Sequence, residues 1–317
     1  MTKYLVTGSA GFIGFYITKA LLERNEEVVG IDNLNPYYIV KLKKDRNSIL
    51  KDFSNYSFYK LDLASRENLY TVLDKEKPKI ICHLAAQAGV RYSFENPFAY
   101  EQSNLLGFLN LIEWAKKNTE NFVYASSSSV YGNNKKIPFS EIDRVDNPTS
   151  LYAATKKANE LIAYAYHNLF ELPITGLRFF SIYGPWGRPD MALYKFAEKI
   201  IKEKPIDVYG YGKMKRDFSY VEDIVPPVLK TLDTPRKYEI YNLGRSNPVE
   251  LLYFISLIEK ELGIRAKKEF LPIQPGEVPE TYADTTKAQK ELDFEPRTSI
   301  EDGVKAFVKW FKNYQST

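Results

Sequence analysis

The fold is decided near the start of the chain, by the stretch Tyr4-Leu5-Val6-Thr7-Gly8-Ser9-Ala10-Gly11-Phe12-Ile13-Gly14. An apolar, β-rich run precedes the first glycine and a helical pattern follows the last one. Gly8 permits a tight turn, Gly11 lets the backbone approach a pyrophosphate, and Gly14 allows a helix to pack closely on a strand. The helix N-terminus offers free N–H groups and a favourable dipole to phosphates. The stretch therefore predicts a dinucleotide-binding turn.

The rest of the first half alternates short apolar runs with helical patterns. Strands are expected over residues 27–31, 57–61, 79–83, 122–125 and 175–179, and helices over 12–24, 67–76, 100–118 and 152–170. Strands separated by helices indicate a parallel sheet covered on both faces, which explains why the strands are continuously apolar. The fold class expected is α/β, with a Rossmann-type doubly wound parallel sheet.

Proline and glycine become frequent after residue 180, and the expected helices are shorter, over 192–203, 249–262 and 300–312. No clean linker or repeat separates the two halves. We expect a dinucleotide-binding domain over residues 1–180 and a smaller C-terminal α/β substrate domain over 181–317, with an approximate, interleaved boundary.

Composition excludes several classes of protein. The net charge of +4 is small for 317 residues and its basic residues are dispersed, so no nucleic-acid partner is expected. The single cysteine, Cys82, lies in an apolar run and fits a reducing compartment. Two histidines without a Cys/His cluster make a metal site unexpected. No stretch approaches the roughly 20 apolar residues of a membrane span. A cytoplasmic enzyme is the expectation.

Asp32 ends the second expected strand about twenty residues after the glycines, the spacing of a carboxylate that binds the ribose hydroxyls. Such a carboxylate would repel a 2′-phosphate, which favours NAD over NADP. Two alternatives stay open: Asp32 is a turn residue before Asn33, or a cation from residues 41–46 folds back toward a phosphate. Asp62-Leu63 and Leu84-Ala85-Ala86 follow later strands, where a carboxylate could bind adenine and small side chains could accommodate the cofactor.

Tyr152 and Lys156 lie four residues apart and share one helical face. A free tyrosine has a pKa of about 10, and a neighbouring cation favours its phenolate, which can act as a base. Serines 126–129 end the preceding strand, where a hydroxyl could bind the reacting oxygen. A Tyr-x-x-x-Lys pattern alone mostly marks a surface helix, but its place after a Gly-rich first turn favours catalysis.

The whole chain resembles the extended short-chain dehydrogenase/reductase family, and within it the UDP-glucuronate 4-epimerases. The resemblance is carried by the segments 83–93, 177–191, 212–218 and 278–285. It implies Tyr152 as the base, Lys156 as its partner and Ser127 as the hydroxyl beside the sugar O4. It implies cofactor contacts from Gly8, Gly11, Phe12, Ile13, Gly14, Asp32, Asn33, Asp62, Leu63, Leu84, Ala85, Ala86, Tyr152 and Lys156. It implies substrate contacts from Arg91, Ser127, Ser128, Ser181, Arg188 and Arg216.

The reaction implied is C4 epimerisation of UDP-glucuronate to UDP-galacturonate through a 4-keto sugar, with a tightly bound NAD regenerated in each cycle. Related 4,6-dehydratases generally carry an acidic residue before the Val-Tyr-Gly at 130–132, where this chain has serines. Dehydration needs such an additional acid or base, and it is therefore set aside. Alternatives are a 4-epimerase of neutral sugars, UDP-glucose or UDP-N-acetylglucosamine, and a non-catalytic NAD-binding regulator.

The 4-keto form of a glucuronic acid is a β-keto acid, which readily loses CO₂. We hypothesise that Ser128, Ser181 and Arg188 form a carboxylate clamp that prevents this loss, since arginine offers a permanently charged fork. Arg188 could instead pair with Asp190. Arg91 could likewise pair with Glu95, and Arg216 with Asp217 or Glu222.

The expected helices 100–118 and 152–170 carry apolar residues on more than one side. A helix that is apolar on two sides needs a second packing partner. Relatives commonly dimerise through two such helices per subunit, and a homodimer is expected.

Overall fold

The computed structural model describes residues 2–274 and 278–316. The chain forms two compact units. Unit 1 comprises residues 2–132, 144–179 and 225–241, and unit 2 comprises residues 133–143, 180–224, 242–274 and 278–316. The expected boundary at residue 180 falls at a junction between the units, but residues 133–143 belong to unit 2 and residues 225–241 to unit 1.

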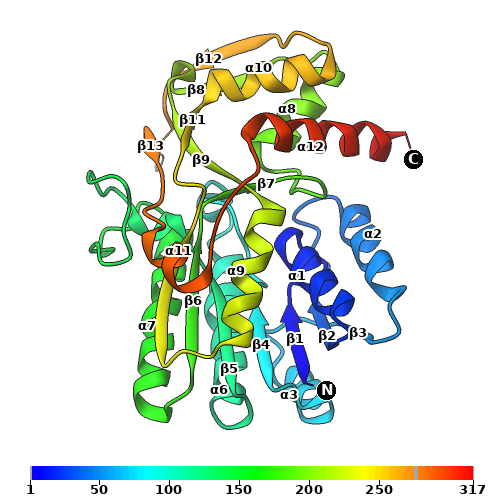
Figure 1. Cartoon of the computed structure of the whole chain (residues 1–317), viewed down its shortest axis with the longest axis vertical. Helices are drawn as coiled ribbons and strands as arrows, with labels where there is room; N and C mark the ends of the chain where they lie inside the picture. Colours follow the sequence, from blue (N-terminus) through cyan, green and yellow to red (C-terminus); the bar gives the residue numbers. More distant parts are fainter. Residues whose placement is uncertain (1, 275–277, 317) are drawn as a thin grey trace. The chain divides into compact units, whose positions relative to one another are not determined.

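Unit 1 is built on a seven-stranded sheet in the order β10-β6-β5-β4-β1-β2-β3 (Figure 1). The strands are β1 (Lys3–Thr7), β2 (Glu27–Asp32), β3 (Tyr56–Lys60), β4 (Ile80–His83), β5 (Asn121–Ser127), β6 (Ile174–Phe179) and β10 (Tyr238–Leu243). The pairings from β1 to β6 are parallel, with β5 and β6 in register from Phe122↔Ile174 to Ser127↔Phe179. The strand order reverses between β1 and β4, where open α/β sheets bind their ligands. The expected doubly wound fold is confirmed.

The seventh strand comes from beyond residue 180 and was not expected. It follows α9 (Val221–Asp233), a helix that contains Pro226 and Pro227. Each proline removes one helical N–H donor, so prolines at these positions disfavour a helix in the sequence pattern. Buried packing outweighs this loss, because Ile224, Val228 and Leu232 recur every four residues and are fully buried. β10 then lies beside β6 in the sheet, and Ile174 N–H donates to Lys237 O over 3.1 Å.

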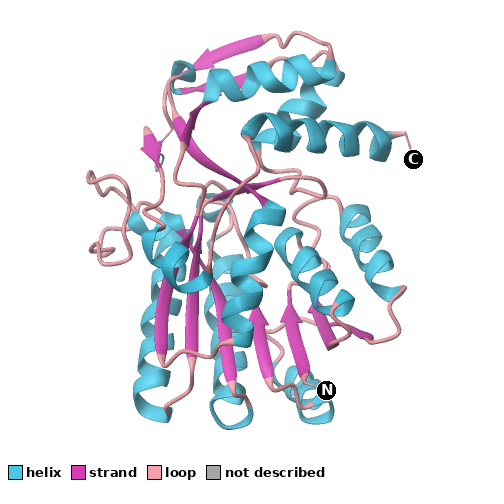
Figure 2. Cartoon of the chain, in the orientation of Figure 1, coloured by secondary structure: helices cyan, strands magenta, loops and turns pink. Residues whose placement is uncertain are grey.

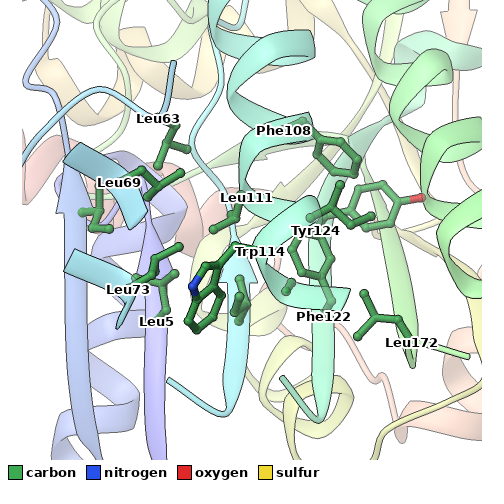
Figure 3. Packing of buried hydrophobic residues seen from close by; sticks show 14 of the residues in the cluster. Leu5, Leu63, Leu69, Leu73, Phe108, Leu111, Trp114, Phe122, Tyr124 and Leu172 are labelled. Atoms are coloured by element: carbon green, nitrogen blue, oxygen red, sulfur yellow. The ribbon is translucent and has the colours of Figure 1, made fainter. Parts of the chain in front are cut away.

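One face of the sheet is covered by α3 (Arg66–Glu76), α6 (Gly107–Asn118) and α7 (Leu151–Phe170). Figure 3 shows the packing of Leu69 and Leu73 from α3 with Phe108, Leu111 and Trp114 from α6, over Phe122 and Tyr124 of the sheet. α1 (Phe12–Glu23) packs on β2 and against α2 (Val40–Lys51). α2 was not expected, because its buried side chains include the polar Lys43, Arg46 and Asn47 and leave no clear apolar period.

The expected helix over residues 100–118 is wrong in detail. α5 (Pro97–Tyr100) leads into a π-helix, η1 (Glu101–Leu106), and α6 begins only at Gly107. A π-helix widens the turn by one residue and is frequent at functional sites. Here it lies around the buried Asn104.

Unit 2 contains a sheet in which β9 (Lys215–Tyr220) pairs with β7 (Ser181–Tyr183), β11 (Pro248–Glu250) and β13 (Glu280–Thr281). A separate pair joins β8 (Ile206–Tyr209) to β12 (Lys268–Leu271). The helices, drawn in cyan in Figure 2, are α8 (Ala192–Ile201), α10 (Leu251–Leu262), α11 (Thr286–Leu292) and α12 (Ile300–Gln315). Among the described residues, no helix is long and apolar enough to cross a membrane.

Candidate active site

The Gly-rich turn joins β1 to α1 as expected, and its geometry depends on glycine. Gly8 has a φ of +71°, and its N–H donates to Ile31 O at the end of β2 over 2.7 Å. A Cβ on Gly8 would lie 2.8 Å from Ala85 N, and a Cβ on Gly14 would lie 2.0 Å from Gly8 O. α1 begins at Phe12, directly before Ile13, and its N-cap residue is Gly11. No described side chain caps this N-terminus. This leaves helix N–H groups for an anion, so the turn fits a dinucleotide pyrophosphate.

Asp32 is buried at the end of β2, and its carboxylate accepts a hydrogen bond from Leu34 N–H over 2.8 Å. Burial raises the pKa of Asp32, and the positive charges of Lys43 and then Arg46 oppose this rise. Lys43 and Arg46 therefore do come close to Asp32. Lys43 Nζ donates to Asn35 O over 2.8 Å, and Arg46 donates to Ala10 O of the Gly-rich turn over 3.0 Å. These contacts hold the loop around the carboxylate that we expect to bind ribose.

Asp62, whose carboxylate is expected to bind adenine, lies beside Asn33, another expected cofactor contact. Asn33 Nδ2 donates to Asp62 Oδ2 over 2.9 Å, and Asp62 Oδ1 accepts from Ala64 N–H. The side chain of Leu63 packs in the core with α3 and α6 (Figure 3), so a cofactor contact from this residue would come from its backbone.

The loop after β4 carries Leu84, Ala85 and Ala86 alongside the Gly-rich turn. Leu84 N–H donates to Thr7 O over 3.1 Å, and Ala85 N–H donates to Thr7 Oγ1 over 3.2 Å. Thr7 Oγ1 also bonds His83 Nδ1 over 2.8 Å. Burial, and then the charge of Lys156, lower the pKa of His83 to about 3, so this imidazole is neutral at pH 7. These contacts hold the ends of β1 and β4 together at the strand-order reversal.

Tyr152 and Lys156 lie in the first two turns of α7, where Ser150 Oγ caps the helix by accepting a hydrogen bond from Ala153 N–H. Lys156 is buried, and its Nζ donates to Ala125 O of β5 over 2.8 Å. Burial lowers the pKa of Lys156 to about 8. Tyr152 packs edge-on against Tyr100, with 6.1 Å between the ring centroids. Ser127 ends β5, where its Oγ accepts from Ser129 N–H, and Ser128 begins the 3₁₀ turn η2 (Ser128–Tyr131).

A hydrogen-bond network beside Tyr152 was not expected from the sequence. Asn104 accepts from Gln87 N–H over 2.8 Å, and its Nδ2 donates to Gln87 O and to Thr155 Oγ1, each over 3.0 Å. Thr155 Oγ1 in turn donates to Tyr152 O over 2.8 Å. The π-helix therefore ties the loop after β4 to α7. The only indication in the sequence was Asn104 itself, a polar residue within an otherwise apolar helical pattern.

The other expected substrate residues are divided between the units. Arg91 in unit 1 lies at the N-terminus of α4 (Tyr92–Glu95) and is exposed. In unit 2, Ser181 begins β7, and Arg216 on β9 donates to Lys215 O and Pro279 O. Arg188 forms a two-pronged ion pair with Asp190, with 3.0 Å between Nε and Oδ1. Asp190, the alternative partner of Arg188, is therefore the residue that binds its guanidinium in this structure.

Trp186 packs against Trp310 and Tyr314 of α12, so it is a packing residue of unit 2. Among the described residues, no group of three or more His, Cys, Asp or Glu side chains could hold a metal ion.

A Gly-rich turn at a strand-order reversal, with Tyr152 and Lys156 on the helix after β5, defines a short-chain dehydrogenase/reductase of the extended type. The family model described as GDP-mannose 4,6-dehydratase matches residues 5–307, and the chain belongs to this family. A probable UDP-glucuronate 4-epimerase of Rhizobium meliloti is 43% identical over 99% of this chain and 98% of that protein. An uncharacterised protein of Methanocaldococcus jannaschii is 54% identical over 97% of this chain and 95% of that protein.

A solved structure extends this similarity to three dimensions. The UDP-glucuronic acid 4-epimerase of Bacillus cereus, in complex with UDP-glucuronic acid and NAD, superimposes with a TM-score of 0.91. It is 34% identical in sequence, and the match covers 99% of this chain and 100% of that one.

Proposed function

We propose that this chain is an NAD-dependent isomerase that interconverts UDP-glucuronate and UDP-galacturonate by epimerisation at C4. The observation that carries the proposal is the hydrogen bond from Lys156 Nζ to Ala125 O. This bond ties the helix that carries Tyr152 to β5, two residues before Ser127, in a fold shared with a UDP-glucuronic acid 4-epimerase.

NAD fits the residues present, as judged by the Gly8–Gly14 turn, the uncapped start of α1 and the buried Asp32. A bound NAD would supply the acceptor for the C4 hydride and the source from which the hydride returns. The remaining cofactor contacts are assigned to the residues at the strand ends: Phe12, Ile13, Asn33, Asp62, Leu63, Leu84, Ala85, Ala86, Tyr152 and Lys156. Asp32 would receive hydrogen bonds from the ribose hydroxyls and repel a 2′-phosphate, which favours NAD over NADP.

Tyr152 removes the O4 proton, and the ammonium of Lys156 favours the phenolate that does so. Ser127 donates a hydrogen bond to the sugar O4 and keeps it oriented. After the 4-keto sugar turns over, Tyr152 returns the proton to the same oxygen. The protein therefore needs one base for both half-reactions, and no second acid for elimination.

The family model is named for a dehydratase, but the chemistry of this chain favours epimerisation. Dehydration across C5 and C6 requires an additional acid or base. The residues before Val130 are serines, with no Asp or Glu.

The substrate carboxylate is assigned to Ser128, Ser181 and Arg188, the carboxylate clamp. Arg188 forms a two-pronged ion pair with Asp190 here, so in the clamp the substrate carboxylate would replace Asp190 as its partner. We assign the diphosphate to Arg91 and Arg216. The chain is expected to act as a homodimer in the cytoplasm.

The test is to incubate the purified protein with UDP-glucuronate, without added NAD, and to follow the products by proton NMR. UDP-galacturonate without a pentose product supports both the reaction and a retained NAD. A UDP-pentose identifies a decarboxylase and contradicts the proposal. No change with NAD added also contradicts it, and UDP-glucose and UDP-N-acetylglucosamine then become the substrates to try.

A further inference from the structure

Three residues recur at intervals of four along α7, namely Tyr152, Lys156 and Glu160, and the last two are buried against the sheet. Lys156 Nζ donates to Ala125 O over 2.8 Å, and Glu160 Oε1 accepts from Ser126 Oγ over 2.7 Å. Consecutive residues of β5 are thus held by consecutive turns of the catalytic helix. Ser127 is the next residue of the same strand.

Glu160 is joined to a second buried group. Arg178 on β6 donates to Glu160 Oε1 from Nε over 2.8 Å and to Oε2 from Nη2 over 2.9 Å. The exposed fractions of the two side chains are 2% and 1%. Arg178 Nη1 donates to Tyr131 OH over 3.0 Å, and the guanidinium lies 4.9 Å from the centre of the Tyr131 ring. The Glu160–Arg178 pair therefore connects α7, β5, β6 and η2.

Stability alone does not account for such a pair. Removing two charges from water is costly, and apolar residues of similar volume often stabilise a buried position as well or better. The pair does fix geometry, because each hydrogen bond constrains both the distance and the direction of its partner. Its ends lie beside the two residues assigned to the reaction: Ser126 precedes Ser127, and Lys156 lies between Glu160 and Tyr152 on the same helical face.

We propose that Glu160 and Arg178 are positioning residues, which fix α7 against β5 and η2 so that Tyr152 and Ser127 address the same sugar oxygen. This inference rests on the proposed function. A misplacement of about 1 Å in a catalytic group can reduce a rate about 10²-fold. The pair would therefore act on kcat, because it touches no part of the substrate.

Two variants break a link to the site and leave the ion pair in place. Ser126→Ala removes the hydroxyl donor to Glu160, and Tyr131→Phe removes the acceptor of Arg178. We expect kcat for UDP-glucuronate to fall about tenfold in each variant, with KM within about twofold of the unaltered chain. Ser126→Thr keeps a hydroxyl and is expected to recover most of the kcat lost in Ser126→Ala.

Asn121 provides a matched control on the same strand. It is buried at the other end of β5, where its Nδ2 donates to Thr231 O and Leu232 O over 2.8 and 2.9 Å. Asn121→Ala is expected to lower the free energy of unfolding while kcat stays within twofold. The inference is overturned if Ser126→Ala and Tyr131→Phe both keep kcat within twofold, or if Asn121→Ala loses as much kcat as they do.

Failure of the proposed function has a different pattern. An unaltered chain that does not turn over UDP-glucuronate counts against the function, and the variants are then compared on the neutral UDP-sugar that the chain does epimerise. An active unaltered chain with insensitive variants counts against the positioning role alone.

Discussion

The ammonium of Lys156 donates a hydrogen bond to the carbonyl oxygen of Ala125 over 2.8 Å, and Lys156 is only 2% exposed to solvent. This contact ties α7 to the last residues of β5. It also takes a charge out of water, and this burial lowers the pKa of Lys156 to about 8.

Activity is therefore expected to fall as pH rises above about 8, because neutral Lys156 no longer favours the Tyr152 phenolate. Stability should change in the opposite direction. Between pH 8 and the unfolded pKa of about 10.4, the unfolded chain binds more protons than the folded one, so this group's contribution to stability rises with pH. Kcat measured from pH 6 to 10 tests the first statement. The stability advantage of Lys156→Met in urea unfolding should narrow over pH 8–10; a constant difference would contradict the second.

Tyr152→Phe removes the proposed base and preserves the ring that packs against Tyr100. We expect turnover to fall at least 10²-fold, within the range for the loss of a general base, while NAD remains bound. Product formation by NMR and the NAD content of the purified variant measure the two effects. Unimpaired turnover would remove Tyr152 from its assigned role.

Arg188→Ala tests the carboxylate clamp. Without the guanidinium, the carboxylate of the 4-keto sugar is free to align with the ketone and leave as CO₂. We expect release of a UDP-4-ketopentose, detected by mass spectrometry, together with slower epimerisation. Asp190→Asn is the matched control: it removes the charge that pairs with Arg188 but keeps the guanidinium, and it should release no pentose. Normal epimerisation by Arg188→Ala without a ketopentose would refute the clamp.

Gly14→Ala is expected to disrupt cofactor binding, because its Cβ would lie 2.0 Å from Gly8 O in the turn. Relieving this clash requires a backbone shift, and overpacking of this kind typically costs about 1–3 kcal/mol. The purified variant should contain less NAD and have a lower Tm. Gly263→Ala is a control: it lies at a φ of +75° with no atom within 4 Å of the added Cβ, and it should lower Tm with NAD content unchanged.

A homodimer is predicted from the exposed apolar side chains of α6 and α7. Leu109 on α6 and Leu161 and Tyr164 on α7 are 42%, 59% and 56% exposed. Such side chains commonly mark an interaction surface when they gather on neighbouring elements. Light scattering at micromolar concentration should give twice the monomer mass of 36.6 kDa. Leu161→Glu should shift the mass to that of a monomer, and a monomeric unaltered chain would contradict the prediction.

The sequence by itself determined the features that depend on neighbours along the chain. The Gly8–Gly14 turn, the strand ending at Asp32 and the Tyr152–Lys156 pair all follow from local periodicity and fixed spacing. The resemblance to the epimerases rested on the same continuous segments, and the family was confirmed.

Only the tertiary structure decided the features whose partners lie far apart in the chain. β10 joins the sheet although it lies beyond residue 180. It follows α9, a helix whose two prolines disfavour a helical prediction. Asn104 reaches Thr155 across 51 residues, and Ser126 reaches Glu160 across 34. The position of a buried polar residue cannot be predicted from hydrophobic periodicity. Its burial costs desolvation free energy, and only a hydrogen-bond partner that folding brings close offsets this cost. Which polar residues support the catalytic helix was therefore decided by packing rather than by pattern.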